Sequence, residues 1–338
     1  MSEQTRNNAD QSTHIPHVSI GFPVFNAEAN LRQSLDSILA QTYTDFELLI
    51  SDNCSTDGTA EICKEYVARD PRIRYERQPR NMGIQYNFNY TVQMARGELF
   101  KWTAADVIHD PTFLERCVTT LDEDEAIVCC HSRSDYIDFS GNRLYGVDPA
   151  GSAEAATSSV PHRRFADVLF KHGWGARVFA VIRREALLRT GLLEHHYGWH
   201  KVMFAGLALV GRYHLIDEIL FLEMDHDTIE EGRDGSTAGQ AESDLPATHD
   251  REGNSFHRFA FMRGYLQMAW WFSPNVYTAL RCTGWVCLYP LQIGKWRRLT
   301  ASKISRSAAY KLISKTHSQL FSGGRDKRQR KAVVDEHA

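Results

Sequence analysis

Side chains that could bind a polar or charged ligand gather in three short segments of the first third of the chain. These segments are residues 23–26, 52–58 and 105–107. Carboxylates such as Asp52 and Asp106 can accept hydrogen bonds from N–H groups, and they are ligands that hard divalent cations prefer. Neither GxGxxG nor GxxxxGK followed by Ser or Thr occurs, which excludes the ordinary dinucleotide fingerprint and the P-loop.

Hydrophobic patterning predicts that each of these segments follows a strand. Strands are expected at residues 17–22, 46–51, 73–75 and 98–103. Helices are expected after Asn26, which can cap a helix, and near residues 59–68, 84–95 and from Pro111 onward. This alternation predicts an α/β fold with a doubly wound, parallel sheet and helices on both faces. Ligands bind such sheets at the carboxyl ends of the strands, where the three segments lie.

Charge and cysteine content narrow the class of protein. The 338 residues include 39 Lys and Arg against 42 Asp and Glu, a balance that argues against a nucleic-acid partner. Seven cysteines without a CxxC pair favour a reducing cytosol. Residues 1–11 are polar and contain no signal peptide, and Arg281 and Pro290 interrupt the apolar run 276–293, so we expect a cytoplasmic protein without a membrane span.

Four pieces of sequence occur in a fixed order in the first third of the chain: VSIGFPVFNAE, SILAQTYTDFELLISDNCSTDGTAEIC, NMGIQYNFN and ARGELFKWTAAD. In order and spacing they resemble the family 2 glycosyltransferases, which have a nucleotide-sugar-binding GT-A fold. The resemblance implies an enzyme that transfers a sugar from a nucleoside-diphosphate sugar.

The resemblance also implies roles for individual residues in the nucleotide-sugar site. The Asp52 carboxylate would accept from the N–H groups of a uracil or guanine base, and backbone groups of Pro23 and Phe25 would border that base. Glu28 would contact the nucleotide or support the loop, and Asp57 would either cap the next helix or face the ribose. The full set is Pro23, Phe25, Asn26, Glu28, Asp52, Asp57, Arg80, Asn81, Gly83 and Asp106.

Arg80, Asn81 and Gly83 precede an expected helix N-terminus, where a diphosphate would bind favourably. A polar turn with glycine at a special dihedral angle is the alternative interpretation.

The metal motif departs from the family pattern. Family members carry an acidic pair after the fourth strand that holds Mg²⁺ or Mn²⁺; here Asp106 matches the first position, and Val107 occupies the second. Valine cannot ligate, so we expect a divalent metal to be weakly required or dispensable. His226 matches a family histidine near the diphosphate and is a second metal candidate, while His109 and Asp110 are expected in a solvated loop.

The second half of the chain should bind the acceptor. The family's catalytic base is usually an Asp, and its position falls on His200, which could also take a proton from a sugar hydroxyl near neutral pH. His195 and His196 are nearby alternatives, and a packed or surface histidine is the competing interpretation. Asp106 is the second residue expected to take part in catalysis.

The C-terminal part is basic and aromatic. Twelve Lys or Arg stand against one Asp between residues 295 and 331. This pattern suits a segment that touches anionic lipid, and equally a packed helix pair followed by a solvated tail; RNA binding is a weaker third reading. The expected divisions are a disordered N-terminus (1–16), a nucleotide-sugar half (17–125), an acceptor half (126–246), a helical extension (247–320) and a flexible basic tail (321–338).

The resemblance, taken with these observations, implies an inverting glycosyltransferase of hexosyl or deoxyhexosyl type. It also implies a glycan or lipid-linked acceptor in surface polysaccharide biosynthesis, and we expect the enzyme in the cytoplasm or peripherally at the inner membrane face. Val107 and His200 motivate an alternative, a non-catalytic protein that binds nucleotide sugars on the same fold. A nucleotidyltransferase is disfavoured because the chain lacks a Gly- and Arg/Lys-rich triphosphate loop.

Overall fold

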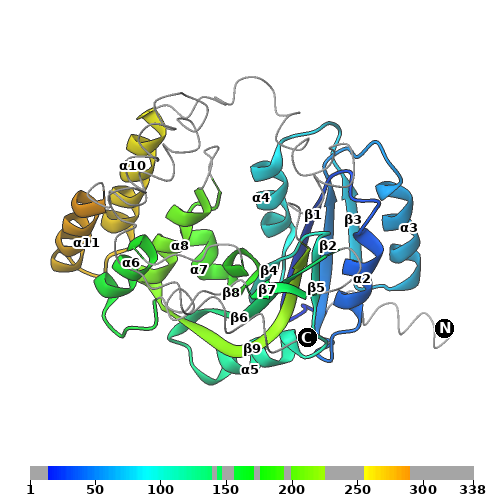
Figure 1. The fold of residues 1–338 in the computed structure, drawn as a ribbon, viewed down its shortest axis with the longest axis horizontal. Coiled ribbons are helices and arrows are strands. Elements are labelled where there is room, and N and C mark those ends of the chain that lie inside the picture. The colour runs from blue at the N-terminus through cyan, green and yellow to red at the C-terminus, as the bar shows by residue number, and fades with distance from the viewer. Residues whose placement is uncertain are drawn as a thin grey trace, which may run out of the picture. The chain divides into compact units, whose positions relative to one another are not determined.

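A mixed nine-stranded sheet organises the described residues, which are 14–138, 143–146, 156–170, 176–193, 199–224 and 255–289 of a computed structural model (Figure 1). Its main path runs in the order β3-β2-β1-β4-β8-β6-β9-β5, and β7 pairs with β6. The strands are β1 (Val18–Val24), β2 (Phe46–Asp52), β3 (Ile73–Arg77), β4 (Leu99–Trp102), β5 (Val107–His109), β6 (Ile127–Ile137), β7 (Arg143–Gly146), β8 (Val181–Arg183) and β9 (Arg212–Met224).

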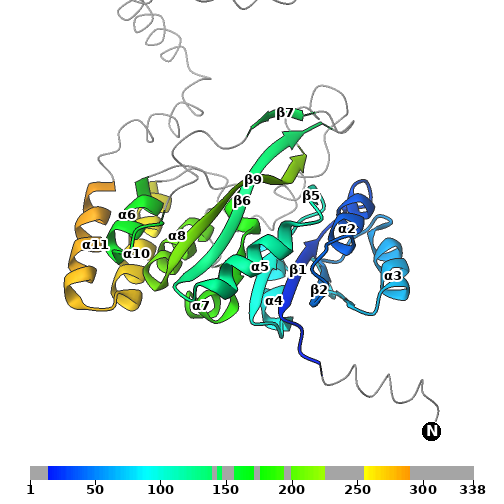
Figure 2. The same ribbon diagram turned by 90° about the horizontal axis from the view of Figure 1, so that it is seen from below.

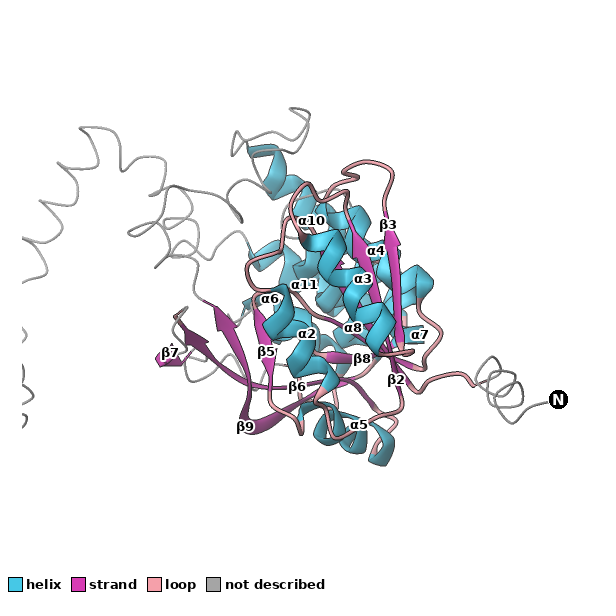
Figure 3. Ribbon diagram, turned by 90° about the vertical axis from the view of Figure 1, so that its right-hand side faces the viewer, coloured by secondary structure: helices cyan, strands magenta, loops and turns pink. Residues whose placement is uncertain are grey.

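The first four strands form a parallel half-sheet covered on both faces. β1 and β2 are buried along their whole length, as near-continuous apolar strands of a parallel sheet should be. Helices α2 (Leu31–Leu39) and α3 (Thr59–Arg69) cover one face, and α4 (Ile84–Met94) packs on the other (Figures 1 and 3). Gly21 of β1 permits the close approach of α4, because a Cβ there would lie 2.4 Å from Thr91 Oγ1.

The second half joins this sheet through antiparallel strand β8, which pairs with β4 on one side and β6 on the other. The long strands β6 and β9 run parallel to each other (Figure 2), and β5 returns antiparallel along the far end of β9. The parallel and antiparallel pairings show that six of the nine strands run in the same direction, namely β1, β2, β3, β4, β6 and β9. The predicted fold class is confirmed.

Six further helices accompany the second half, within the residues described. They are α5 (Phe113–Glu123), α6 (Pro161–Phe170), α7 (Arg184–Arg189), α8 (Trp199–Val210), α10 (Ser255–Phe272) and α11 (Val276–Leu288), with a short 3₁₀ helix at Ala176–Phe179. Helix α8 packs on α6 and α10. Residues up to Val286 belong to one compact unit, and a second unit begins at Cys287.

No helix among the described residues has the length and apolar content to cross a bilayer. The seven cysteines are free thiols, and five of them are buried.

Candidate active site

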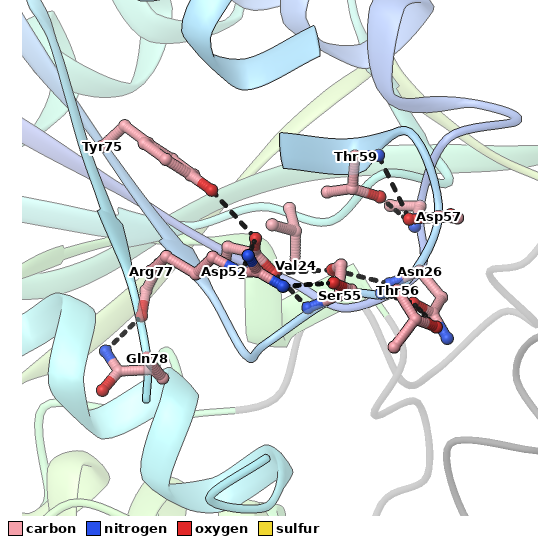
Figure 4. A network of polar contacts seen from close by, with 12 residues as sticks. Val24, Asn26, Asp52, Ser55, Thr56, Asp57, Thr59, Tyr75, Arg77 and Gln78 are labelled. Carbon is pink, nitrogen blue, oxygen red and sulfur yellow. Dashed lines mark hydrogen bonds and ion pairs between the residues drawn. The ribbon is translucent and has the colours of Figure 1, made fainter. Parts of the chain in front are cut away.

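The loops that follow β1 and β2 are fastened to each other by reciprocal hydrogen bonds between side chains and backbone (Figure 4). Asn26 Oδ1 accepts from the Thr56 amide at 2.8 Å, and Glu28 Oε2 accepts from the Gly58 amide at 2.9 Å. In return, the Glu28 amide donates to Asp57 Oδ2 at 3.1 Å. Three residues predicted to contact a nucleotide therefore also build the rim of the site.

Asn26 does not cap α2, contrary to the prediction. Its backbone is left-handed, with φ 47°, and its side chain is engaged with Thr56 of the neighbouring loop. Helix α2 begins at Leu31, five residues later, and its N-cap residue Asn30 makes no capping hydrogen bond with its side chain. Asp57 Oδ1 accepts from the Thr59 amide at 3.1 Å, at the start of α3, which favours the capping interpretation of Asp57. Its contact with a ribose stays a prediction.

Asp52 is fully buried at the carboxyl end of β2 and has protein donors on both oxygens (Figure 4). Oδ1 accepts from the Ser55 amide at 2.8 Å and the Ser55 hydroxyl at 2.6 Å. Oδ2 accepts from the Tyr75 hydroxyl at 2.9 Å and lies 3.5 Å from Arg77 Nε. Burial, together with the Asp52 carboxylate, raises the pKa of Tyr75. A nucleobase that donates to Asp52 must therefore displace one of these partners. Of the two partners on Oδ2, Arg77 is more exposed than Tyr75.

The segment before α4 is held by Asn53, a residue that the sequence analysis did not single out. Asn53 is buried; its Nδ2 donates to Asn81 Oδ1 at 2.7 Å, and its Oδ1 accepts from the Met82 amide at 2.7 Å. Gly83 has φ 89°, and its amide donates to Asn81 Oδ1. The segment is thus a polar turn with glycine at a positive φ. Its binding of a diphosphate stays a prediction, and Arg80 is exposed beside it. The signal for Asn53 was its place directly after Asp52 at a strand end.

The loop between β4 and β5 presents Asp106 at the same edge of the sheet. Thr103 donates from its amide to the Gly21 carbonyl at 2.9 Å, which ties the loop to β1. Asp106 is half-buried, and its carbonyl accepts from the Met224 amide of β9 at 2.9 Å. Val107 is buried in β5, opposite Glu223 of β9.

A divalent cation would find few ligands here among the residues that the structure describes. They contain no group of three or more His, Cys, Asp or Glu side chains able to hold a metal. The buried Val107 side chain offers no donor, and Glu223 is the described carboxylate paired opposite it. Asp225 and His226 lie outside the described residues, so His226 stays a predicted ligand.

The family model described as Glycosyl transferase family 2 matches residues 19–190, which is just over half of the chain. The chain belongs to glycosyl transferase family 2.

Relatives within this family include two polysaccharide synthases. The chain is 34% identical to a chondroitin synthase of Escherichia coli over 148 residues, which are 43% of this chain and 21% of the relative. It is 26% identical to a hyaluronan synthase of Pasteurella multocida over 232 residues, 63% of this chain and 21% of the relative. The chain thus spans about a fifth of the length of these synthases.

Among solved structures, TarS of S. aureus (residues 1–349) in complex with UDP-GlcNAc superposes with a TM-score of 0.58. The sequence identity is 15%, and the superposition covers 89% of this chain and 77% of TarS. This likeness supports the GT-A fold of the family 2 chain.

His200, the predicted base of this family 2 chain, lies in the first turn of α8. It is half-buried, and burial lowers its pKa to about 4, with a smaller contribution from the Lys201 charge. The imidazole is therefore neutral at neutral pH and able to accept a proton, though it is a weaker base than an ordinary histidine. His195 and His196 lie outside the described residues.

A buried basic pair lies behind the Asp106 loop, and the sequence analysis missed it. Lys101 of β4 is 1% exposed, and its Nζ lies 2.7 Å from His109 Nε2 of β5. Burial lowers the pKa of Lys101 to about 7, and burial with the Lys101 charge holds the pKa of His109 well below its ordinary value. The expectation that His109 lies in a solvated loop is wrong, because its ring stacks on Phe221 of β9 (ring centroids 6.1 Å apart). Asp110 is exposed, as expected.

Lys101 and His109 belong to the two strands that flank the Asp106 loop. Their contact fixes the spacing of the loop's two ends, and Ser34 Oγ supports the middle by donating to the Ala104 carbonyl at 2.9 Å. The loops after β1, β2 and β4 thus converge at one sheet edge, where Pro23 is buried near the end of β1 and Phe25 is partly buried just after it.

Proposed function

We propose that this chain is a nucleotide-sugar-dependent, inverting glycosyltransferase that extends a glycan. The observation that carries the proposal is the convergence of the loops after β1, β2 and β4 at one sheet edge, in a chain that belongs to glycosyl transferase family 2. The likeness to TarS, solved with UDP-GlcNAc, supports a nucleoside-diphosphate sugar as the donor.

The donor would bind across these three loops. The base would donate to Asp52 after Arg77 moves aside, since Arg77 is half exposed and its 3.5 Å ion pair is the longest of the contacts to Asp52. Arg80, at the mouth of the turn before α4, would offset the negative charge of the diphosphate.

The transfer step requires a base on the acceptor side. We assign this role to His200, which is neutral at neutral pH. The acceptor hydroxyl would give its proton to this imidazole, while its oxygen forms a bond to the anomeric carbon. The bond from that carbon to the diphosphate oxygen breaks on the opposite face, and the nucleoside diphosphate leaves with the electron pair.

A divalent cation would add positive charge at the leaving diphosphate. The described residues supply one carboxylate of the family's pair, Asp106, and do not by themselves form a site for the ion. We therefore assign no step to a metal, and we expect turnover to persist, at least in part, without one.

The acceptor we propose is a growing polysaccharide or a lipid-linked glycan. The support is the similarity to the chondroitin and hyaluronan synthases, which reaches 63% of this chain. The proposal leaves the sugar and the linkage open.

A screen of nucleotide sugars by thermal shift, followed by an assay for diphosphate release, tests this function. We expect one UDP- or GDP-sugar to raise the melting temperature and to release its nucleoside diphosphate faster when a glycan acceptor is added, with or without Mn²⁺. Binding without turnover on any glycan acceptor would favour the non-catalytic alternative. The absence of binding to every nucleotide sugar would contradict both.

A further inference from the structure

The helix pair α10–α11 exposes large apolar side chains around its connecting turn. Trp270 and Trp271 end α10, while Val276, Tyr277 and Leu280 begin α11, and each of the five is between 52% and 67% exposed. Among the described residues before Val286, the other exposed large hydrophobic residues occur singly: Ile15, Val67, Ile84, Leu188 and Ile219. Such a concentration marks an interaction surface.

These five side chains lie mostly outside the buried faces of the helix pair. The buried faces are made by other residues, among them Tyr265 and Met268 of α10 and Cys282 and Val286 of α11. Helix α10 packs on α8 (Figures 1 and 2). The rings of His162 in α6 and Tyr277 in α11 are in contact, with centroids 6.0 Å apart. The two helices therefore carry apolar side chains on two faces, one buried and one open to solvent.

The turn that presents the aromatic residues is well defined. Residues 273–275 connect the helices, and Asn275 Oδ1 accepts from the Thr278 amide at 2.9 Å, which caps α11. Trp271 and Tyr277 are consequently held at the end of a supported hairpin.

The charged residues of these two helices all have one sign. Helices α10 and α11 contain no Asp or Glu, and they carry the exposed Arg263 and Arg281. A bare apolar surface set among cations matches an anionic bilayer, because Trp and Tyr favour the level of the lipid headgroups and cations attract acidic lipids. Since none of the described helices could span a bilayer, the contact would be with one leaflet.

We propose that the tip of the α10–α11 hairpin, formed by Trp270, Trp271, Val276, Tyr277 and Leu280, inserts into the headgroup region of an anionic membrane. This surface lies outside the donor loops, and the inference goes beyond the proposed transferase activity. Its consequence would be to hold the enzyme at the surface where a lipid-linked glycan is found.

Sedimentation of the full chain with vesicles tests this inference. Vesicles of phosphatidylglycerol and phosphatidylethanolamine are compared with vesicles of phosphatidylcholine. We expect wild type to prefer the anionic vesicles, and Trp270→Ser combined with Trp271→Ser to weaken that binding at least tenfold. The matched control, Val67→Ser combined with Leu188→Ser, removes two exposed apolar residues elsewhere and should bind as wild type does.

Tryptophan fluorescence supplies a second readout. Brominated lipids should quench wild type far more than the double Trp variant, and both should melt at the same temperature, because the two indoles are mainly exposed. Nucleotide-sugar binding should be equal in both, which separates this inference from the proposed function.

Three results would overturn the proposal. One is a wild type that does not bind anionic vesicles. Another is a double variant that binds them normally while Lys/Arg→Gln changes after residue 294 abolish binding, which would assign the contact to the tail alone. The third is a wild-type dimer that the double variant disperses without any vesicle binding, which would make the hairpin a contact between two copies of the chain.

Discussion

Asp52 shows how one carboxylate can both hold a loop and receive a ligand. A carboxylate has about four acceptor positions, and Ser55, Tyr75 and Arg77 supply four donors to this one. The inner contacts from Ser55 fix the loop after β2. The outer contacts from Tyr75 and Arg77 are the ones that a nucleobase could replace.

Substitutions at Asp52 and Tyr75 separate these two roles. Asp52→Ala should weaken uridine or guanosine nucleotide binding by about 1–3 kcal/mol, because it removes the acceptor. Tyr75→Phe should lower the free energy of unfolding by about 1 kcal/mol and leave nucleotide affinity nearly unchanged. Calorimetric titration and thermal melts measure the two quantities. Equal losses of affinity in both variants would place Tyr75, rather than Asp52 alone, against the base.

Lys101 should make the stability of the protein depend on alkaline pH. Its pKa is about 7 in the folded protein against an ordinary value of 10.5, so the unfolded chain binds the extra proton between these values. The free energy of unfolding should therefore rise with pH in this window, by up to about 1.4 kcal/mol per pH unit from this group. Lys101→Met should remove that rise, as measured by urea unfolding at pH 7, 8 and 9.

The control for this experiment is Lys64→Met, because Lys64 lies exposed on α3. It should keep the wild-type slope. A Lys101→Met variant with the same slope as wild type would show that the buried lysine keeps its proton well above pH 7.

The elements of the first half could be predicted because their signals are local. The runs that became β1, β2 and β4, and the apolar stripe of α2, are visible within a few residues of sequence. Strand β5 could not be predicted in this way, because it has three residues and pairs with β9, more than a hundred positions later. The burial of His109, its contact with Lys101 and the inward position of Val107 all follow from that distant pairing.

The residue types predicted which side chains could bind a polar ligand, but not which groups these side chains contact in the folded protein. The sequence placed Asn26, Glu28 and Asp57 at the right edge of the sheet, but it could not indicate that they bond to the backbone of the adjacent loop. Those bonds depend on the spacing of two parallel strands, which no single motif encodes.

A substitution at Val107 in β5 tests whether this strand can place a metal ligand beside Asp106. Val107→Asp restores the family's second carboxylate but places a charge where the side chain is 1% exposed. Without metal it should lose about 3–5 kcal/mol of unfolding free energy, because a buried charge is left uncompensated. Mn²⁺ should recover part of that loss if Asp106 and Asp at 107 share the ion. Melts with Mn²⁺ and with chelator, with Val107→Ala as the control for lost packing, measure the difference.

A metal-independent loss of stability in Val107→Asp would show that β5 directs this position away from any cation. In that case the wild-type activity should also survive chelator unchanged.

At the scale of the whole molecule, the donor loops belong to the parallel strands β1, β2 and β4, whereas His200 stands on α8 beyond β8 and α7 in sequence. Binding and transfer should therefore be separable. His200→Gln keeps a polar side chain of similar size but removes the base, and it should retain donor affinity while turnover falls roughly 10²- to 10⁴-fold. In wild type, kcat/KM should fall near pH 4, where the His200 imidazole becomes protonated. This pH lies below the ordinary pKa of a histidine. Donor titration and the pH profile measure both effects.

His214→Gln, on the exposed part of β9, is the control. A His200→Gln enzyme with wild-type turnover would move the search for the base to the segment before α8.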